Sequence, residues 1–174
     1  MRRLAFTLIF LLLLVGGGIF FYFSNNRTGE ITDPRIKLIA AQKNINGFPL
    51  PAELFQSEFL IVNFWASWCP PCIEETPSLI QFTKIHPEFR LVAFSQDDTM
   101  KDVLAFVKLF PNFKNAGVDV VFDESREVAR KFNVSKLPET FIFNRTKNRY
   151  IQISGATNWA DPKLYDSIIT EFKK

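Results

Sequence analysis

A mostly apolar run, residues 60–66 (LIVNFWA), leads almost directly into a CPPC motif that extends from Cys69 to Cys72. A continuous apolar run of this length is typical of a strand that is buried on both faces. Proline is favoured at the first helical positions, because its missing N–H would be unpaired there anyway. We therefore predict a central strand that delivers Cys69 to the start of a helix ending near His86.

The segments that follow alternate between strand and helix patterns, and the last two strands form a hairpin. Strands that alternate with helices predict an α/β domain whose mixed sheet is covered on both faces. A further short strand is expected before the central one, followed by a turn-rich connection at residues 47–51. The expected strands are 35–40, 60–66, 91–95, 118–122, 139–144 and 149–154, and the expected helices are 69–86, 98–110, 125–132 and 161–173.

The chain has only two cysteines, three positions apart, and several kinds of site use this spacing. A structural disulfide here would close a very short loop and would restrain the unfolded chain little. A zinc site requires about four ligands, whereas the chain offers one cysteine pair and a single histidine, His86, at the far end of the helix. The same separation disfavours copper binding. Thiol–disulfide exchange is the chemistry that the pair favours.

The position of each thiol on the helix predicts its role. Cys69 lies at the positive end of the helix, where the dipole and free N–H groups stabilise a thiolate. We expect Cys69 to be the exposed, attacking thiol, and Cys72, one turn later, to be the buried, resolving thiol. Pro70 and Pro71 remove two N–H donors, so the thiolate should be only mildly stabilised. Strong oxidants have a heavily stabilised thiolate, so the pair is predicted to be reducing.

An uncharged stretch of 20 residues, 4–23, follows Arg2 and Arg3. As a helix it would span the roughly 30 Å hydrocarbon core of a membrane. The positive-inside rule then keeps residues 1–3 in the cytoplasm. A cleaved signal peptide is the alternative, although the exit FYFSNN offers no small-residue cleavage site. We expect a single-pass signal-anchor at 4–23, a linker at 24–34 and a domain at 35–174 that faces the periplasm or the cell exterior from a bacterial-type inner membrane.

The composition excludes some classes of function. The net charge is only +3, and two of the positive charges are Arg2 and Arg3, so the domain carries no basic footprint for nucleic acid. Apolar residues make up 47% of the chain and include 20 phenylalanines, which is enough to bury a core without disulfide scaffolding.

Three segments match a known family: LIVNFWASWCPPC up to Cys72, the triplet Glu75–Thr76–Pro77, and VSKLPETFIFN at residues 134–144. Together they resemble the thioredoxin superfamily, most closely its membrane-anchored TlpA/ResA/CcmG group. The resemblance covers residues 35–174. It implies an α/β thioredoxin fold, with a mixed central sheet flanked by helices and preceded by an N-terminal transmembrane helix.

The resemblance also implies a substrate-binding loop. Pro138 would follow Leu137 through a cis peptide bond, and the loop would lie against the cysteine pair and offer backbone groups to a substrate strand. An ordinary trans proline is the alternative, since only about 5–6% of X–Pro bonds are cis. Leu137, Pro138 and Trp68 are therefore predicted substrate-binding residues, although Trp68 is equally compatible with a place in the core.

Glu75 is the predicted proton acceptor. It lies three residues after Cys72, on the same helical face, and a partly buried carboxylate there can take the Cys72 proton. The related proteins carry a glutamate at this motif position. The alternative is a first-turn acid that complements the helix dipole. Asn63 stands where cytosolic thioredoxins have a buried aspartate, and an amide cannot accept the proton, which shifts that role toward Glu75.

These residues predict a membrane-anchored, extracytoplasmic protein-disulfide oxidoreductase that acts as a reductant. Its expected partners are protein thiols or disulfides and a membrane thiol electron donor. The resemblance suggests apocytochrome c as the substrate. A disulfide oxidant or isomerase, and a non-catalytic thioredoxin-like binding module, are the alternatives. We expect a monomer with no cofactor and no metal.

Overall fold

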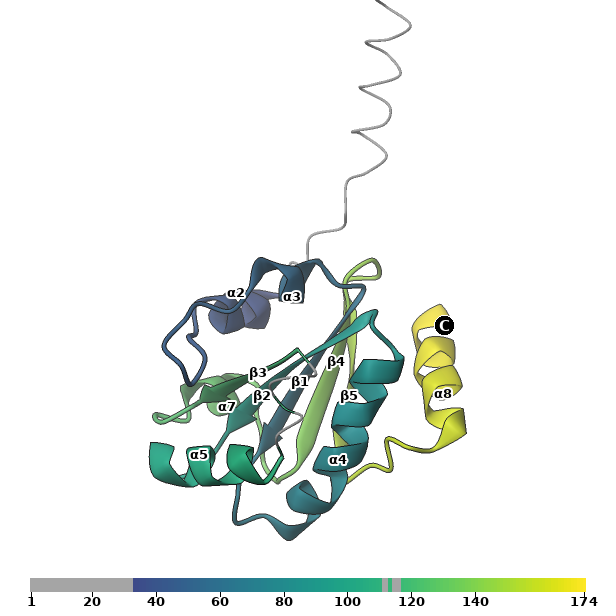
Figure 1. Cartoon of the computed structure of the whole chain (residues 1–174). Helices are drawn as coiled ribbons and strands as arrows, with labels where there is room; N and C mark the ends of the chain where they lie inside the picture. Colours follow the sequence, from purple (N-terminus) through teal and green to yellow (C-terminus); the bar gives the residue numbers. More distant parts are fainter. Residues whose placement is uncertain (1–32, 111–112, 114–116) are drawn as a thin grey trace, which may run out of the picture. The chain divides into compact units, whose positions relative to one another are not determined.

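The apolar run at residues 60–66 forms the middle strand of a mixed sheet. A computed structural model of the chain describes residues 33–110, 113 and 117–174. In it β1 (Phe59–Trp65) lies at the centre of a five-stranded sheet with the order β3-β2-β1-β4-β5 (Figure 1). β1 pairs in parallel with β2 and antiparallel with β4. The sheet is mixed, as predicted.

The elements follow the expected order from β1 to the end of the chain, and the hairpin of β4 and β5 is present. The predicted bounds of the strands and helices are within a few residues of the observed ones. With the labels of Figure 1, the elements are α2 (Pro34–Ala40), α3 (Ala52–Gln56), β1 (Phe59–Trp65), α4 (Pro70–Ile85), β2 (Phe89–Ser95), α5 (Met100–Leu109), β3 (Val118–Phe122), α7 (Glu127–Lys131), β4 (Glu139–Asn144), β5 (Arg149–Ser154) and α8 (Pro162–Lys173).

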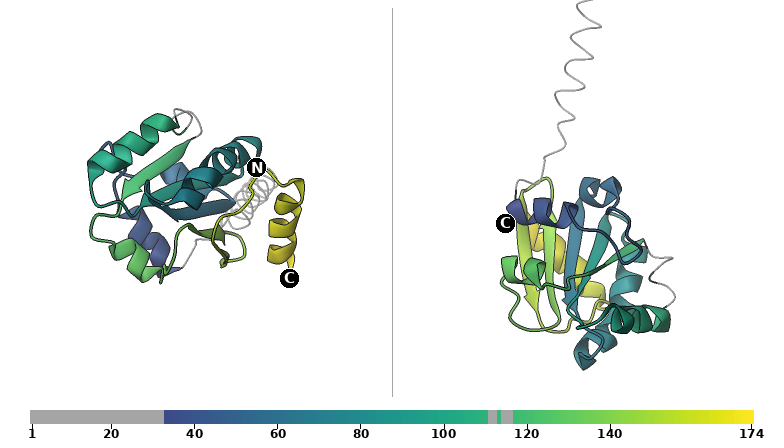
Figure 2. Two further views of the ribbon diagram at one scale, coloured as in Figure 1. Left: turned by 90° about the horizontal axis from the view of Figure 1, so that it is seen from below. Right: turned by 90° about the vertical axis from the view of Figure 1, so that its left-hand side faces the viewer.

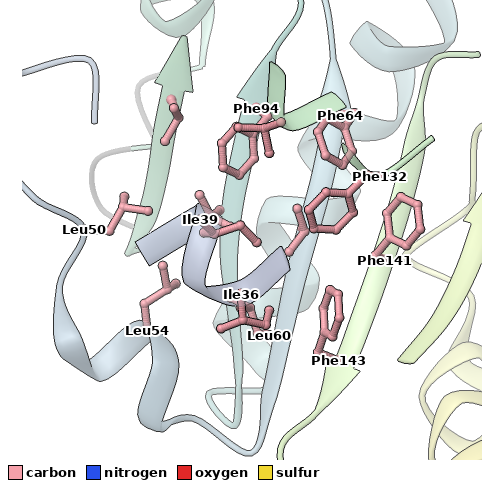
Figure 3. Close-up of a cluster of buried hydrophobic side chains, with 14 of the residues drawn as sticks. Ile36, Ile39, Leu50, Leu54, Leu60, Phe64, Phe94, Phe132, Phe141 and Phe143 are labelled. Carbon is pink, nitrogen blue, oxygen red and sulfur yellow. The ribbon is translucent and has the colours of Figure 1, made fainter. Parts of the chain in front are cut away.

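Every residue of β1 is buried because both faces of the sheet are covered. Leu60, Val62 and Phe64 pack into a cluster with side chains from α2, α3 and α7 (Figure 3). Phe59 and Ile61 point to the other face, where they join side chains from α4 and α8. Figures 1 and 2 show α4 and α8 on the side of the sheet opposite α2 and α7. The alternation of a strand thus places Asn63 and Trp65 on the α4 side.

The strand predicted at residues 35–40 is wrong, because this segment is the helix α2. The Asp33 side chain accepts a hydrogen bond from the Arg35 N–H, and Pro34 occupies the first turn, which are both signals for a helix start. Ile36 and Ile39 are buried at a spacing of three, on the face of α2 that lies over the sheet (Figure 3). The short helix α3 was not expected.

The predicted signal-anchor at residues 4–23 and most of the linker at 24–34 lie outside the described residues. Within the part of the chain that the structure describes, no helix is both long and apolar enough to cross a membrane.

Candidate active site

The loop between β1 and α4 is held in place by a buried carboxylate. Ser67 donates to Asp97 Oδ1 from both its backbone N–H (2.9 Å) and its hydroxyl (2.7 Å). The Ser95 hydroxyl, at the end of β2, donates to Asp97 Oδ2 at 2.7 Å. The Cys69 N–H donates to the carbonyl of Ala66 at 3.2 Å. These bonds fix the position of the CPPC motif relative to the sheet.

Cys69 and Cys72 form a disulfide with an S–S distance of 2.09 Å. Cys72 is fully buried, whereas Cys69 is 4% exposed. Cys69 is thus the more accessible of the two, but the expectation that it would be exposed is wrong. Both cysteines belong to an apolar cluster with Trp65 and Ala66, against which Leu137 also packs. Cys69, though buried, lines the groove described below.

The backbone around Cys69 offers few donors to its sulfur. Pro70 and Pro71 have no N–H. The next two N–H groups, of Cys72 and Ile73, both donate to the carbonyl oxygen of Cys69, at 3.0 and 3.2 Å. The helix start therefore uses its first free donors on a carbonyl group, and they are not directed at the sulfur.

The loop before β4 forms the wall of the groove opposite the CPPC motif. The Leu137–Pro138 peptide bond is cis, Pro138 is buried, and its carbonyl accepts from the Gly155 N–H at 2.9 Å. The carboxylate of Glu139, itself buried, accepts from the N–H of Ser135 at 3.1 Å. Glu139 also accepts from the side chains of Gln152 (2.6 Å) and Ser154 (2.7 Å) in β5. This carboxylate ties the loop to the edge of the sheet.

Between these walls lies a groove of about 500 Å³. Trp68 lines it and is 60% exposed, so its alternative placement in the core is wrong. Leu137 and Cys69 line it as well, so the structure brings three of the predicted site residues together. The remaining lining residues, which are mostly apolar or cationic, are Pro70, Pro71, Gln96, Arg126, Ala129, Arg130, Val134, Ser135 and Lys136.

Glu75 lies in the interior, on the side of α4 that faces the sheet. It is 5% exposed, and its carboxylate accepts from Asn63 Nδ2 (3.1 Å) and from the N–H of Thr157 (3.0 Å). Asn63 Nδ2 also donates to the Thr140 hydroxyl at 2.9 Å. Burial raises the pKa of Glu75 above its usual range, against the opposing hydrogen bonds from Thr157 and Asn63. The Trp159 side chain also opposes the shift, although its indole N–H makes no hydrogen bond to a described residue.

His86 lies at the opposite end of α4 from the cysteines. It ends the helix, and its ring stacks on that of Tyr165 with centroids 4.3 Å apart. Among the described residues, no group of three or more potential ligand side chains comes together to hold a metal ion.

Comparison with known protein families agrees with this geometry. A family model described as thioredoxin-like matches residues 57–150, which is more than half of the chain. The chain belongs to the thioredoxin-like family. The matched segment runs from just before β1 to the start of β5, and so contains the CPPC motif, Glu75 and the cis-proline loop.

Named relatives of this thioredoxin-like chain are thiol-disulfide oxidoreductases. ResA of Bacillus thuringiensis subsp. konkukian is 25% identical over 117 residues, which are 64% of each chain. Sporulation thiol-disulfide oxidoreductase A of Bacillus subtilis is 25% identical over 66% of this chain and 70% of its own. The thiol:disulfide interchange protein DsbE of Allochromatium vinosum is 28% identical over 53% and 49%. The resemblance to the TlpA/ResA/CcmG group is confirmed, although the chain spans only 64% of the length of the first relative.

Solved structures agree on the fold. The structure of MTB dsbF superposes with a TM-score of 0.66 at 22% identity, covering 81% of this chain and 99% of that one. A thioredoxin-family thiol:disulfide interchange protein of Chlorobium tepidum gives a TM-score of 0.59 at 26% identity, covering 75% and 90%. The thioredoxin fold that the motifs implied is therefore present.

Several residues around the site were not anticipated from the sequence. Glu139, which holds the cis-proline loop, carried a usable signal, because it is an acid at the start of a strand pattern that continues with Thr140 and three apolar residues. The N–H of Thr157 and the cationic side chains of Arg126, Arg130 and Lys136 carried no such signal. They reach the site only because the sheet brings distant segments together.

Proposed function

We propose that the chain is a thiol–disulfide oxidoreductase that reduces protein disulfides. One observation carries the proposal: the Cys69–Cys72 disulfide lies at the first turn of α4, with Cys69 on a substrate-sized groove and Cys72 fully buried behind it. A purely structural disulfide would need no such groove. The names of the relatives support the same chemistry.

The first step is attack by the Cys69 thiolate of the reduced protein on one sulfur of the substrate disulfide. A bond forms between Cys69 Sγ and that sulfur, and the substrate disulfide breaks. The second substrate sulfur leaves as a thiolate and takes a proton from solvent. Trp68 and Leu137, on either side of Cys69, are proposed to hold the substrate, with Pro138 shaping the loop.

The second step releases the substrate. The Cys72 thiol loses its proton, and its thiolate attacks Cys69 Sγ. The first substrate sulfur leaves as a thiolate and takes a proton from solvent, so two electrons have passed from the protein to the substrate. We assign the Cys72 proton to Glu75, which lies one turn after Cys72 on α4 and has a pKa raised by burial. A raised pKa makes a carboxylate a better proton acceptor near neutral pH.

The direction of transfer is proposed from the donors around Cys69. The two prolines supply no N–H, and the N–H groups of Cys72 and Ile73 are taken by the Cys69 carbonyl. A thiolate with few donors is weakly stabilised, which favours a reducing pair over a strongly oxidising one.

The setting is proposed from the sequence. The apolar stretch at 4–23 after Arg2 and Arg3 supports a signal-anchor that holds the domain outside the cytoplasm. A membrane thiol donor would then return electrons to the pair. The family resemblance supports apocytochrome c as the substrate.

Trapping tests the proposal. In the Cys72→Ala variant of the full chain, Cys69 can attack a substrate but cannot release it, so a mixed disulfide should accumulate in cells and be identifiable by mass. Cys69→Ser is the matched control and should trap nothing. Absence of a trapped species, together with an unaltered phenotype for Cys69→Ser, would favour a non-catalytic binding module. A trapped substrate and a wild-type pair that is kept oxidised in its compartment would favour an oxidant.

A further inference from the structure

The groove beside Cys69 has one sign of charge. Arg126, Arg130 and Lys136 line it together with apolar side chains such as Val134 and Leu137. None of the described residues that line the groove carries a carboxylate. The cations come from two consecutive segments: Arg126 and Arg130 from the start and the body of α7, and Lys136 from the cis-proline loop that follows it.

The three cations are neutralised to different extents. Arg126 Nη2 lies 2.6 Å from Asp98 Oδ1, so much of its charge is compensated. Arg130 donates to the carbonyl of Ser125 at 2.6 Å, an uncharged acceptor that leaves its charge in place. Lys136 is exposed, and no ion pair among the described residues involves Lys136 or Arg130. Arg130 and Lys136 therefore carry most of the uncompensated charge.

Two carboxylates also lie behind the groove walls, and they limit how far the positive potential of the cations extends. Asp123 is buried and accepts from the N–H groups of Val128 and Ala129, and Glu139 is buried against Ser135 and β5. Neither lines the groove, so neither can contact a bound segment. They lower the positive potential at a distance but leave cations at the contact surface.

We infer that the preferred substrate is an extended polypeptide segment with aspartate or glutamate beside its disulfide cysteine. The apolar lining suits a polypeptide, and cations spread along α7 and the loop that follows it suit acidic side chains beside the cysteine that reacts with Cys69. The inference rests on the proposed function and names the substrate class of the same site.

The test measures reduction of three disulfide-linked peptides of equal length, with Glu, Ser or Lys at the positions beside the cysteine. The full chain is reduced beforehand. The reaction is quenched with acid at set times, and the products are measured by mass spectrometry to give the second-order rate constant. An exposed ion pair contributes up to about fivefold in an equilibrium. The Glu peptide should therefore react about tenfold faster than the Lys peptide. The difference should largely disappear near 1 M salt, where the Debye length is only about 3 Å.

Variants assign this preference to the groove. Arg130→Gln combined with Lys136→Gln should remove most of the preference. Lys101→Gln combined with Lys163→Gln removes the same net charge from exposed positions on α5 and α8, and should leave it unchanged. Asp98→Asn should increase the preference, because it frees Arg126 from its partner. Glutathione disulfide serves as the small anionic probe. The rate constant for its reduction should change little when Arg130 and Lys136 are replaced.

Each outcome decides between the alternatives. Equal rates for the three peptides in the wild type would overturn the charge preference while leaving the oxidoreductase function intact. The groove as a site for acidic polypeptides would be overturned if the preference survives in the variant with Arg130→Gln and Lys136→Gln. It would also be overturned if this variant slows the reduction of glutathione disulfide more than that of the Glu peptide. If no peptide is reduced, the proposed function itself fails. Anisotropy of labelled peptides with Ser in place of Cys, binding to the oxidised chain, should give the same charge order.

Discussion

Cys69 and Glu75 are almost equally buried, at 4% and 5% exposed, yet they lie in opposite environments. Cys69 is surrounded by apolar side chains. The nearest backbone N–H groups after it, those of Cys72 and Ile73, donate to its carbonyl oxygen. Glu75 lies six residues later, in a polar network with Asn63 and the N–H of Thr157. One side of the helix start faces the groove, and the other is closed against the sheet.

Under the proposed function, the two sides would have separate tasks. On the groove side, Cys69 is covered by apolar side chains but still lines the groove. On the interior side, hydrogen bonds hold the Glu75 carboxylate in place while burial raises its pKa, as its proposed role as a proton acceptor requires. The predictions below test whether the two sides can be disturbed separately.

The largest expected difference is between two tryptophans on either side of the loop. Trp65 is 2% exposed, and its ring packs on that of Phe106 with centroids 4.2 Å apart, whereas Trp68 is 60% exposed. Trp65→Ala should cost about 3–5 kcal/mol in the free energy of unfolding, and Trp68→Ala less than about 0.5 kcal/mol. Chemical denaturation measures both. Trp65→Phe is the milder control, since it removes an indole N–H that has no hydrogen-bond partner among the described residues. A large loss for Trp68→Ala would contradict its place on the groove.

The second prediction disturbs the interior side alone. Glu75→Gln removes the proposed proton acceptor, so release of the mixed disulfide should slow by about 10²-fold near neutral pH. The first attack by Cys69 should change much less. Rapid-quench kinetics separate the two steps.

Glu74→Gln is the matched control, because Glu74 is the neighbouring acid and is exposed. It should leave both steps unchanged. An equal slowing in both variants would mean that Glu75 acts only through the charge of the helix start.

The third prediction loosens the groove wall without touching Glu75. Glu139→Gln replaces a carboxylate that accepts from Ser135, Gln152 and Ser154 with an amide that cannot accept from all three. We expect a loss of about 1–3 kcal/mol in unfolding free energy and a slower first attack, with release unaffected. Glu124→Gln, at an exposed position near α7, should change neither. A slower release step in Glu139→Gln would show that the two sides are coupled.

The smallest effect is a pH dependence of stability. The pKa of Glu75 is raised in the folded chain, so the folded state binds the proton more tightly than the unfolded state does. Its contribution to stability is fully present below the unfolded pKa of about 4.5 and is lost as the pH rises through the folded pKa. Unfolding of the oxidised chain across this range should show the loss in wild type. Glu75→Gln should lack this component, and identical profiles would contradict the raised pKa.

Local patterns in the sequence predicted much of this molecule. The apolar run that became β1, the prolines that open α4 and the spacing of Cys72 from Glu75 are all short-range signals. The prediction for residues 35–40 is wrong because these six residues alternate enough to resemble a strand, whereas the helix signals, Asp33 and Pro34, come just before them.

The groove itself was not predictable in this way. Trp68 comes from the loop after β1, whereas Arg130 and Lys136 come from α7 and the loop that follows it, and only the sheet order β3-β2-β1-β4-β5 brings these two parts of the chain together. The exposure of Cys69 was misjudged for the same reason, since Leu137, which packs against its cluster, is distant in sequence. Long-range packing has no counterpart in a short motif.

The most direct test of a reducing centre is the equilibrium reduction potential of the Cys69–Cys72 pair, measured for the full chain in glutathione or dithiothreitol buffers. The weakly stabilised Cys69 thiolate predicts a potential more negative than about −180 mV, the value typical of protein disulfide isomerase. A potential near about −120 mV, that of a strong oxidant, would contradict it.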